Sequence, residues 1–183
     1  MNTTILPGPS ADFDHPIDIL DGCHERIKRQ CATIQRIAEH VASRGADEEA
    51  RTAARAVMRY FDTAGANHHR DEEEDLFPAL LHAVPDRELP ATRALVYRLK
   101  ADHVRLDAAW GEMRKRLARL ADAGEAAVDT DAARAFGAAY DRHIALEEAE
   151  MLPLARRVLE TRVLYRMGER MAERRGVTPS SGR

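Results

Sequence analysis

One segment of this chain occurs twice, without a gap in either copy. Residues 68–78 read His-His-Arg-Asp-Glu-Glu-Glu-Asp-Leu-Phe-Pro, and residues 143–153 read His-Ile-Ala-Leu-Glu-Glu-Ala-Glu-Met-Leu-Pro. Both copies contain His-x-x-x-Glu-Glu and end in two apolar residues and a proline. On a helix, side chains four residues apart project from one face, so each copy can present an imidazole and a carboxylate to the same metal ion. Two such pairs, facing each other across a helical bundle, predict a two-metal site.

The repeat extends to the rest of the chain. His24 and His103 are lone histidines that precede the two copies, each within its own half of the sequence. Apolar residues flank the histidines at matched offsets in both halves: Phe61 and Phe136, Leu20 and Leu99, Ile27 and Leu106. The chain therefore reads as two helical hairpins, each with one lone histidine and one His-x-x-x-Glu pair, which indicates a pseudo-twofold site between the halves.

The spacing of apolar residues predicts an all-α protein. Helical periodicity runs from Pro16 to Ser43, from about Asp47 to Leu81, from about Pro90 to Gly124, and from Asp129 or Thr130 to Pro153. A shorter basic helix is expected over roughly residues 154–174. Aromatic residues make up only 5% of the chain and hydrophobic residues 44%, which favours an alanine- and leucine-rich bundle over a sheet. Short turns between long helices predict an antiparallel up-and-down four-helix bundle with an extra C-terminal helix.

We expect an N-terminal extension over residues 1–14, the bundle over 15–160, the C-terminal helix over 161–175 and a flexible tail over 176–183. The net charge of -3 gives no field that would attract nucleic acid, and no apolar run is long enough to cross a membrane. Cys23 and Cys31 lie too far apart on one predicted helix to form a disulfide. Reduced thiols and the lack of a secretory signal predict a cytoplasmic protein; no feature identifies a protein partner.

The candidate metal ligands are four imidazoles and two carboxylates. Imidazole suits iron, copper, zinc and nickel, and a carboxylate can use both oxygens to bridge two ions. A glutamate on the apolar face of a bundle is costly unless it is paired or bound to a cation, which also favours a metal site. Four nitrogens and two bridging carboxylates leave positions open on two octahedral metals, as reactivity requires. These candidates are His24, His68, Glu72, His103, His143 and Glu147.

The first copy of the repeat allows a second register. His69 and Glu73 also stand four residues apart, on a face turned by roughly 100°. Alignment on the prolines favours His68 and Glu72, because Glu72 precedes Pro78 by the same interval that separates Glu147 from Pro153 in the second copy. Glu73 then becomes either a neighbour of the ligands or a surface residue.

The chain resembles hemerythrin-like proteins of the HHE cation-binding family. His24, His103 and the two segments 68–78 and 143–153 carry the resemblance, which covers about residues 15–160. It implies a four-helix bundle around two non-haem iron ions with a bridging oxygen species. It also implies a small gaseous or peroxide ligand, because members bind, sense or react with dioxygen, nitric oxide or peroxide.

The departures from the family pattern bear on function. Oxygen-carrying hemerythrins have a second histidine four residues after the one on the third helix, where this chain has Asp107, and an aspartate where it has Glu147. The chain is therefore closer to the four-His, two-Glu members, which include iron-repair proteins, but it lacks their N-terminal cysteine module. Asp107 and Tyr140 are candidates to contact an imidazole or the bound ligand, since they lie near His103 and His143 on the predicted helices.

Three functions are open at this point. The first is binding or sensing of dioxygen or a related oxidant. The second is an enzyme that turns over peroxide or nitric oxide, or a donor of iron for cluster repair. The third is a bundle in which a metal serves only to stabilise the fold.

Overall fold

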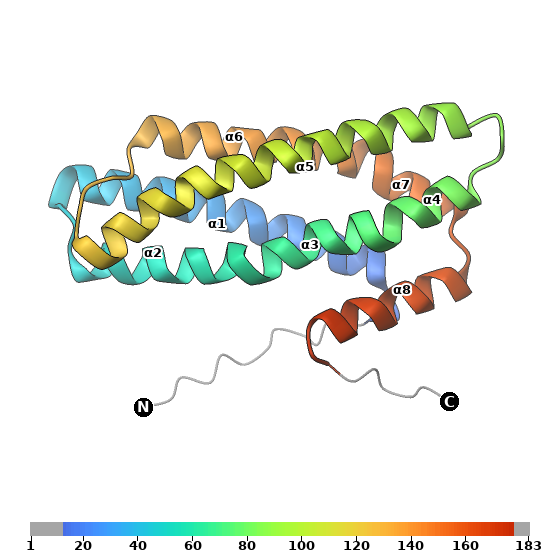
Figure 1. Cartoon of the computed structure of the whole chain (residues 1–183), viewed down its shortest axis with the longest axis horizontal. Helices are drawn as coiled ribbons and strands as arrows, with labels where there is room; N and C mark the ends of the chain where they lie inside the picture. Colours follow the sequence, from blue (N-terminus) through green and yellow to red (C-terminus); the bar gives the residue numbers. More distant parts are fainter. Residues whose placement is uncertain (1–12, 178–183) are drawn as a thin grey trace.

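The computed structural model describes residues 13–177, which form an antiparallel bundle of four helical rods with a shorter helix packed against one end (Figure 1). All the regular structure in this part of the chain is helical, as the apolar periodicity predicts. The first rod is α1 (Pro16–Arg44). The second contains α2 (Glu48–Tyr60), η1 (Phe61–Gly65), α3 (Ala66–Arg70), η2 (Asp71–Leu76) and α4 (Phe77–Ala83).

The third rod contains α5 (Leu89–Ala118) and η3 (Arg119–Ala123), and the fourth contains α6 (Thr130–Leu146), η4 (Glu147–Met151) and α7 (Leu152–Val158). The last element is α8 (Thr161–Arg174). The segments labelled η are π-helical turns that continue a rod without breaking it. No helix within residues 13–177 is long and apolar enough to cross a membrane.

Local sequence explains where the rods begin and end. The first rod ends at Gly45 (φ 86°) and the third at Gly124 (φ 68°), and both are left-handed conformations that favour glycine. Asp47 starts the second rod by accepting a hydrogen bond from the amide of Ala50 at 3.0 Å. Asp129 starts the fourth in the same way, accepting from the amide of Ala132 at 2.7 Å.

The predicted end of the fourth helix at Pro153, with the next helix starting at residue 154, was wrong by several residues. Pro153 does not end the rod, because the hydrogen-bond ladder shifts in the π-helical turn η4 just before it and the rod continues into α7. The chain leaves the helix at Leu159, which has an extended conformation, and α8 begins at Thr161. The expected N-terminal extension and flexible tail fall largely on residues 1–12 and 178–183, outside the described part of the chain.

A buried polar layer divides the core along the bundle axis. One hydrophobic cluster, which includes Ile27, Phe61 and Leu106, fills the end near the α1–α2 turn. The other, which includes Leu20 and Leu99, fills the end near α4 and α7. Cys23 and Cys31 are buried, free thiols in these clusters, as their spacing predicts. The polar layer lies where each rod passes from one cluster to the other.

The C-terminal helix α8 packs against α1 and against η2 at one end of the bundle (Figure 1). The packing is close at Gly168, where an added Cβ would lie 1.8 Å from the backbone carbonyl oxygen of Phe13. Any larger side chain at this position would therefore have to push α8 away from the bundle.

Candidate metal centre

The six candidate ligands meet in the polar layer at the middle of the bundle. α1 contributes His24, α5 contributes His103, and each His-x-x-x-Glu copy contributes one pair from the second or fourth rod. All six side chains are buried, with at most 3% of any residue exposed. Helical spacing is the reason: a residue four positions from a ligand returns to the same inward face.

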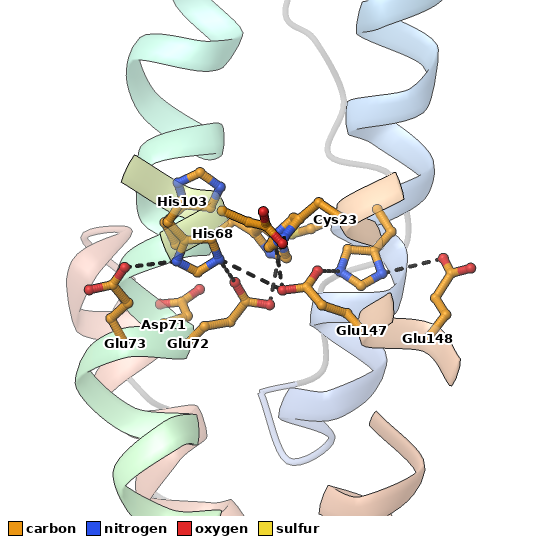
Figure 2. Close-up of polar contacts among 12 residues, drawn as sticks. Cys23, His68, Asp71, Glu72, Glu73, His103, Glu147 and Glu148 are labelled. Carbon is orange, nitrogen blue, oxygen red and sulfur yellow. Dashed lines mark hydrogen bonds and ion pairs between the residues drawn. The ribbon is translucent and has the colours of Figure 1, made fainter. Parts of the chain in front are cut away.

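The two glutamates lie between two pairs of imidazoles (Figure 2). Glu147 Oε2 lies 3.1 Å from His24 Nε2, and Glu147 Oε1 lies 3.0 Å from His143 Nε2. Glu72 Oε2 lies 3.3 Å from His103 Nε2, and Glu72 Oε1 lies 3.5 Å from His68 Nε2. Two donor atoms bound to one first-row metal at about 2.1 Å and at right angles lie roughly 3 Å apart, so these separations suit shared metal ions.

Two overlapping buried ligand sets contain both glutamates. One contains His24, His68 and both glutamates; the other contains His103, His143 and the same two glutamates. Because each carboxylate has an oxygen in both sets, it can bridge two ions. This arrangement supports the two-metal site that the repeat predicts.

Most polar side-chain atoms of this layer lack a hydrogen bond. Among the described residues, the buried side-chain nitrogens and oxygens without a hydrogen bond all belong to the six candidate ligands. Their mutual approaches of 3.0–3.5 Å do not have the alignment of a hydrogen bond. Unsatisfied buried polar atoms cost about 1–3 kcal/mol each, more if charged, and binding a cation would remove that cost. The residues therefore fit a metal centre.

Electrostatics in the metal-free layer differ between the two carboxylates. Burial and the charge of Glu147 raise the pKa of Glu72 to about 8. Burial also opposes ionisation of Glu147, but the imidazoles of His103, His143 and His24 outweigh it and hold the Glu147 pKa well below its usual range. Burial would lower the pKa of His103, yet the neighbouring Glu147 and Glu72 raise it to about 10. Without a metal, the layer therefore retains protons that a cation must displace.

The second glutamate of each copy contacts an imidazole from the other half of the chain (Figure 2). Glu73 Oε1 lies 2.8 Å from His103 Nδ1, and Glu148 Oε1 lies 3.4 Å from His24 Nδ1. Lys28 Nζ also donates to Glu148, at 2.9 Å. Carboxylates in this position fix the tautomer and orientation of an imidazole ligand. The sequence alone did not decide whether Glu73 contacts a ligand or lies on the surface. The available signal was that Glu73 and Glu148 occupy the same position in the two copies, each directly after a candidate ligand glutamate.

The neighbouring register, His69 with Glu73, does not converge on the shared carboxylates. The His69 ring stacks on that of His103, with centroids 4.1 Å apart, and His69 Nδ1 lies 3.1 Å from Asp107 Oδ1. Asp107 thus contacts an imidazole, but that of His69 and not that of His103. Tyr140 is buried, and its ring packs against Phe61 and Phe136. The geometry favours His68 and Glu72 as the ligand pair.

The spacing of apolar residues did not predict the π-helical turns. In each copy, η2 or η4 directly precedes the helix that contains Pro78 or Pro153. Proline has no N–H to donate to the carbonyl four residues earlier, so the regular hydrogen-bond ladder must shift there. The prolines were therefore the signal for these turns, which place the second half of each motif against the centre.

Fold and site together define a helical-bundle protein with a buried His/Glu metal centre. The Hemerythrin HHE cation binding domain family matches residues 15–155, and the chain belongs to this family. A protein of Haemophilus influenzae that is described as uncharacterized is 30% identical over 171 residues. That match covers 93% of this chain and 96% of the relative, so the similarity includes α8 as well as the bundle.

Proposed function

We propose that the chain is a non-haem diiron protein that binds or senses dioxygen or a related small oxidant. The observation that supports this proposal most strongly is the pair of buried ligand sets that share Glu72 and Glu147. Each set offers two imidazoles and two carboxylates, a mixture that suits iron. A closed four-coordinate zinc site would not need two sets joined by common carboxylates.

The residues of the chain would hold the ions and keep the site dry. The carboxylates of Glu72 and Glu147 would bridge, and the four histidines would bind through Nε2. Glu73 and Glu148 would accept Nδ1–H from His103 and His24 and so keep Nε2 directed inward. Two bound irons would supply reversible electron exchange and open positions for a small ligand. The hydrophobic clusters cover the layer along the bundle axis, and the six candidate ligands are at most 3% exposed.

The two thiols support a cytoplasmic location as part of this proposal. Cys23 and Cys31 are buried and unpaired, and burial raises the pKa of Cys31 to about 12, so it stays a neutral thiol. Buried reduced cysteines fit a reducing compartment such as the cytoplasm.

The test is a comparison of visible spectra of the iron-loaded protein with and without oxygen. We expect a reversible difference in the wild type, because an open iron position exchanges its ligand, and none in the Glu72→Gln/Glu147→Gln double variant. Sustained consumption of peroxide or nitric oxide over many turnovers would instead identify an enzyme. A protein with no oxygen-dependent spectrum, whose stability depends on zinc, would overturn the proposal in favour of a structural metal.

A further inference from the structure

A cavity of about 300 Å³ opens between α5 and α6 beside the metal layer. It is much larger than the roughly 30 Å³ that one water occupies in the liquid. Arg98, Asp102 and Arg105 line it from α5, and Arg142 and His143 line it from α6. The cavity therefore joins a cluster of arginines near the surface to one of the candidate metal ligands.

The charges that line this cavity are not balanced. Asp102 is the carboxylate among the lining residues, and Arg105 pairs with it. Arg98 and Arg142 have no carboxylate partner within the described part of the chain. Other arginines of the bundle, such as Arg114 and Arg116, pair with acidic residues. Two unpaired guanidinium groups at one cavity favour an anion with several acceptor oxygens, because each group offers a fork of N–H donors.

The inner wall of the cavity presents an unsatisfied buried nitrogen. His143 is 3% exposed, and its Nδ1 has no hydrogen-bond partner among the described residues. The nearest printed carboxylate oxygen, Asp102 Oδ2, is 4.0 Å away, beyond hydrogen-bond distance. His103 differs, because Glu73 Oε1 lies 2.8 Å from its Nδ1 and forms a hydrogen bond. The Nδ1 atoms of His24 and His68 also lack a hydrogen bond among the described residues. His143 is distinguished by its place in the cavity wall, where it lacks the acceptor that Glu73 provides for His103.

We propose that this cavity is a binding site for a small inorganic oxyanion of the phosphate class. Arg98 and Arg142 hold the anion by charge-assisted hydrogen bonds, and one of its oxygens accepts Nδ1–H from His143. The anion supplies for His143 the acceptor that Glu73 supplies for His103. The anion site is argued from the cavity, its arginines and the unpartnered Nδ1 of His143, none of which requires a bound metal. Its influence on a metal held by His143 rests on the proposed function.

The direct test uses metal-free protein, so that it does not depend on iron. Phosphate is added at constant ionic strength, and the ring nitrogens of His143 are followed by long-range ¹H–¹⁵N NMR. We expect saturable shifts in the wild type and at least about tenfold weaker binding in the Arg98→Gln/Arg142→Gln double variant. The matched control is Arg93→Gln/Arg134→Gln, which removes one exposed arginine from each of the same two helices.

Equal phosphate affinity in all three proteins, or the same shifts with chloride, would overturn the proposal, because either result means general screening and not a site. The iron-loaded wild type provides the second measurement. A phosphate-dependent change in its visible spectrum, absent from the double variant and present in the control, would support the effect on His143. If the chain binds phosphate but no iron, the anion site stands and the diiron proposal fails.

Discussion

The carboxylates of Glu73 and Glu148 each contact an imidazole from the opposite half of the chain. Glu73 is 35% exposed and Glu148 37%, so the contacts lie at the edge of the layer. Replacing such an outer acceptor typically weakens metal binding about 10–100-fold. We predict this loss for Glu73→Gln and a smaller one for Glu148→Gln, whose contact is longer. Competition with a chelator measures both affinities.

Glu150→Gln is the control for these variants. It removes one exposed carboxylate from η4 without touching an imidazole of the layer. A loss in Glu150→Gln equal to that in Glu73→Gln would mean that the affinity depends on net charge and not on the His103 contact.

The protons of the metal-free layer predict how metal affinity depends on pH. The pKa values of Glu72, about 8, and of His103, about 10, are raised, so both groups are largely protonated at neutral pH. A metal must displace these protons, and its affinity should therefore increase as pH rises toward 8, by up to about tenfold per pH unit for each proton. Anaerobic titrations with ferrous iron on either side of neutrality measure the slope. An affinity that is flat or falls with rising pH would contradict this assignment.

At the residue scale, much of the candidate site could be predicted from the sequence. The offset of four residues places His68 with Glu72 and His143 with Glu147, because a helix fixes which side chains share a face. The contact between His69 and Asp107 depends on how the second and third rods are rotated against each other. Rotation is set by packing over the whole core, and no single motif encodes it.

At the scale of elements, α8 is tied to the segment that carries Glu72. Arg174 Nη1 lies 2.6 Å from Asp71 Oδ1, and Arg174 also pairs with Asp75. Asp71 and Asp75 are buried, and the second copy has Leu146 and Glu150 at the matching positions. The ion pairs therefore break the symmetry of the repeat and fix η2 next to one bridging carboxylate.

Replacing Arg174 measures how much its ion pairs with Asp71 and Asp75 stabilise the bundle. Breaking a buried ion pair costs about 3–5 kcal/mol when the remaining charge has no other partner. Asp75 keeps its pair with Arg170, so we predict that Arg174→Ala lowers the free energy of unfolding by less, about 2 kcal/mol. Arg175, which also pairs with Asp71, limits the loss. Urea denaturation measures the change. Arg166→Ala, an exposed arginine of the same helix, should stay within about 0.5 kcal/mol of wild type. A change in Arg174→Ala no larger than in this control would exclude a stabilising role for the pairs.

The docking position of α8 could not be predicted from the sequence, because it too depends on packing between distant segments. Its amphipathic pattern indicated a helix, but its docking depends on Gly168 meeting Phe13 and on acidic residues about 100 positions away in the chain. The four rods, by contrast, follow from local signals: apolar periodicity inside them, and Gly45, Asp47 or Gly124 at their ends.

For the molecule as a whole, the duplicated sequence predicts two equal halves around one centre, and the bundle has that arrangement. The halves differ where the structure adds specific contacts. The first copy is fixed by α8, whereas the second faces the arginine-lined cavity next to His143. The two ligand sets are thus alike in composition but differ in their surroundings, so two ions held there would have different environments.

The most direct test of this account is the iron content of protein purified without added metal, measured together with zinc and manganese. We predict two irons per chain, one for each ligand set, and loss of both in the Glu72→Gln/Glu147→Gln variant, because the sets share these carboxylates. A single ion per chain, stoichiometric zinc, or full iron content in the double variant would contradict the shared two-metal centre.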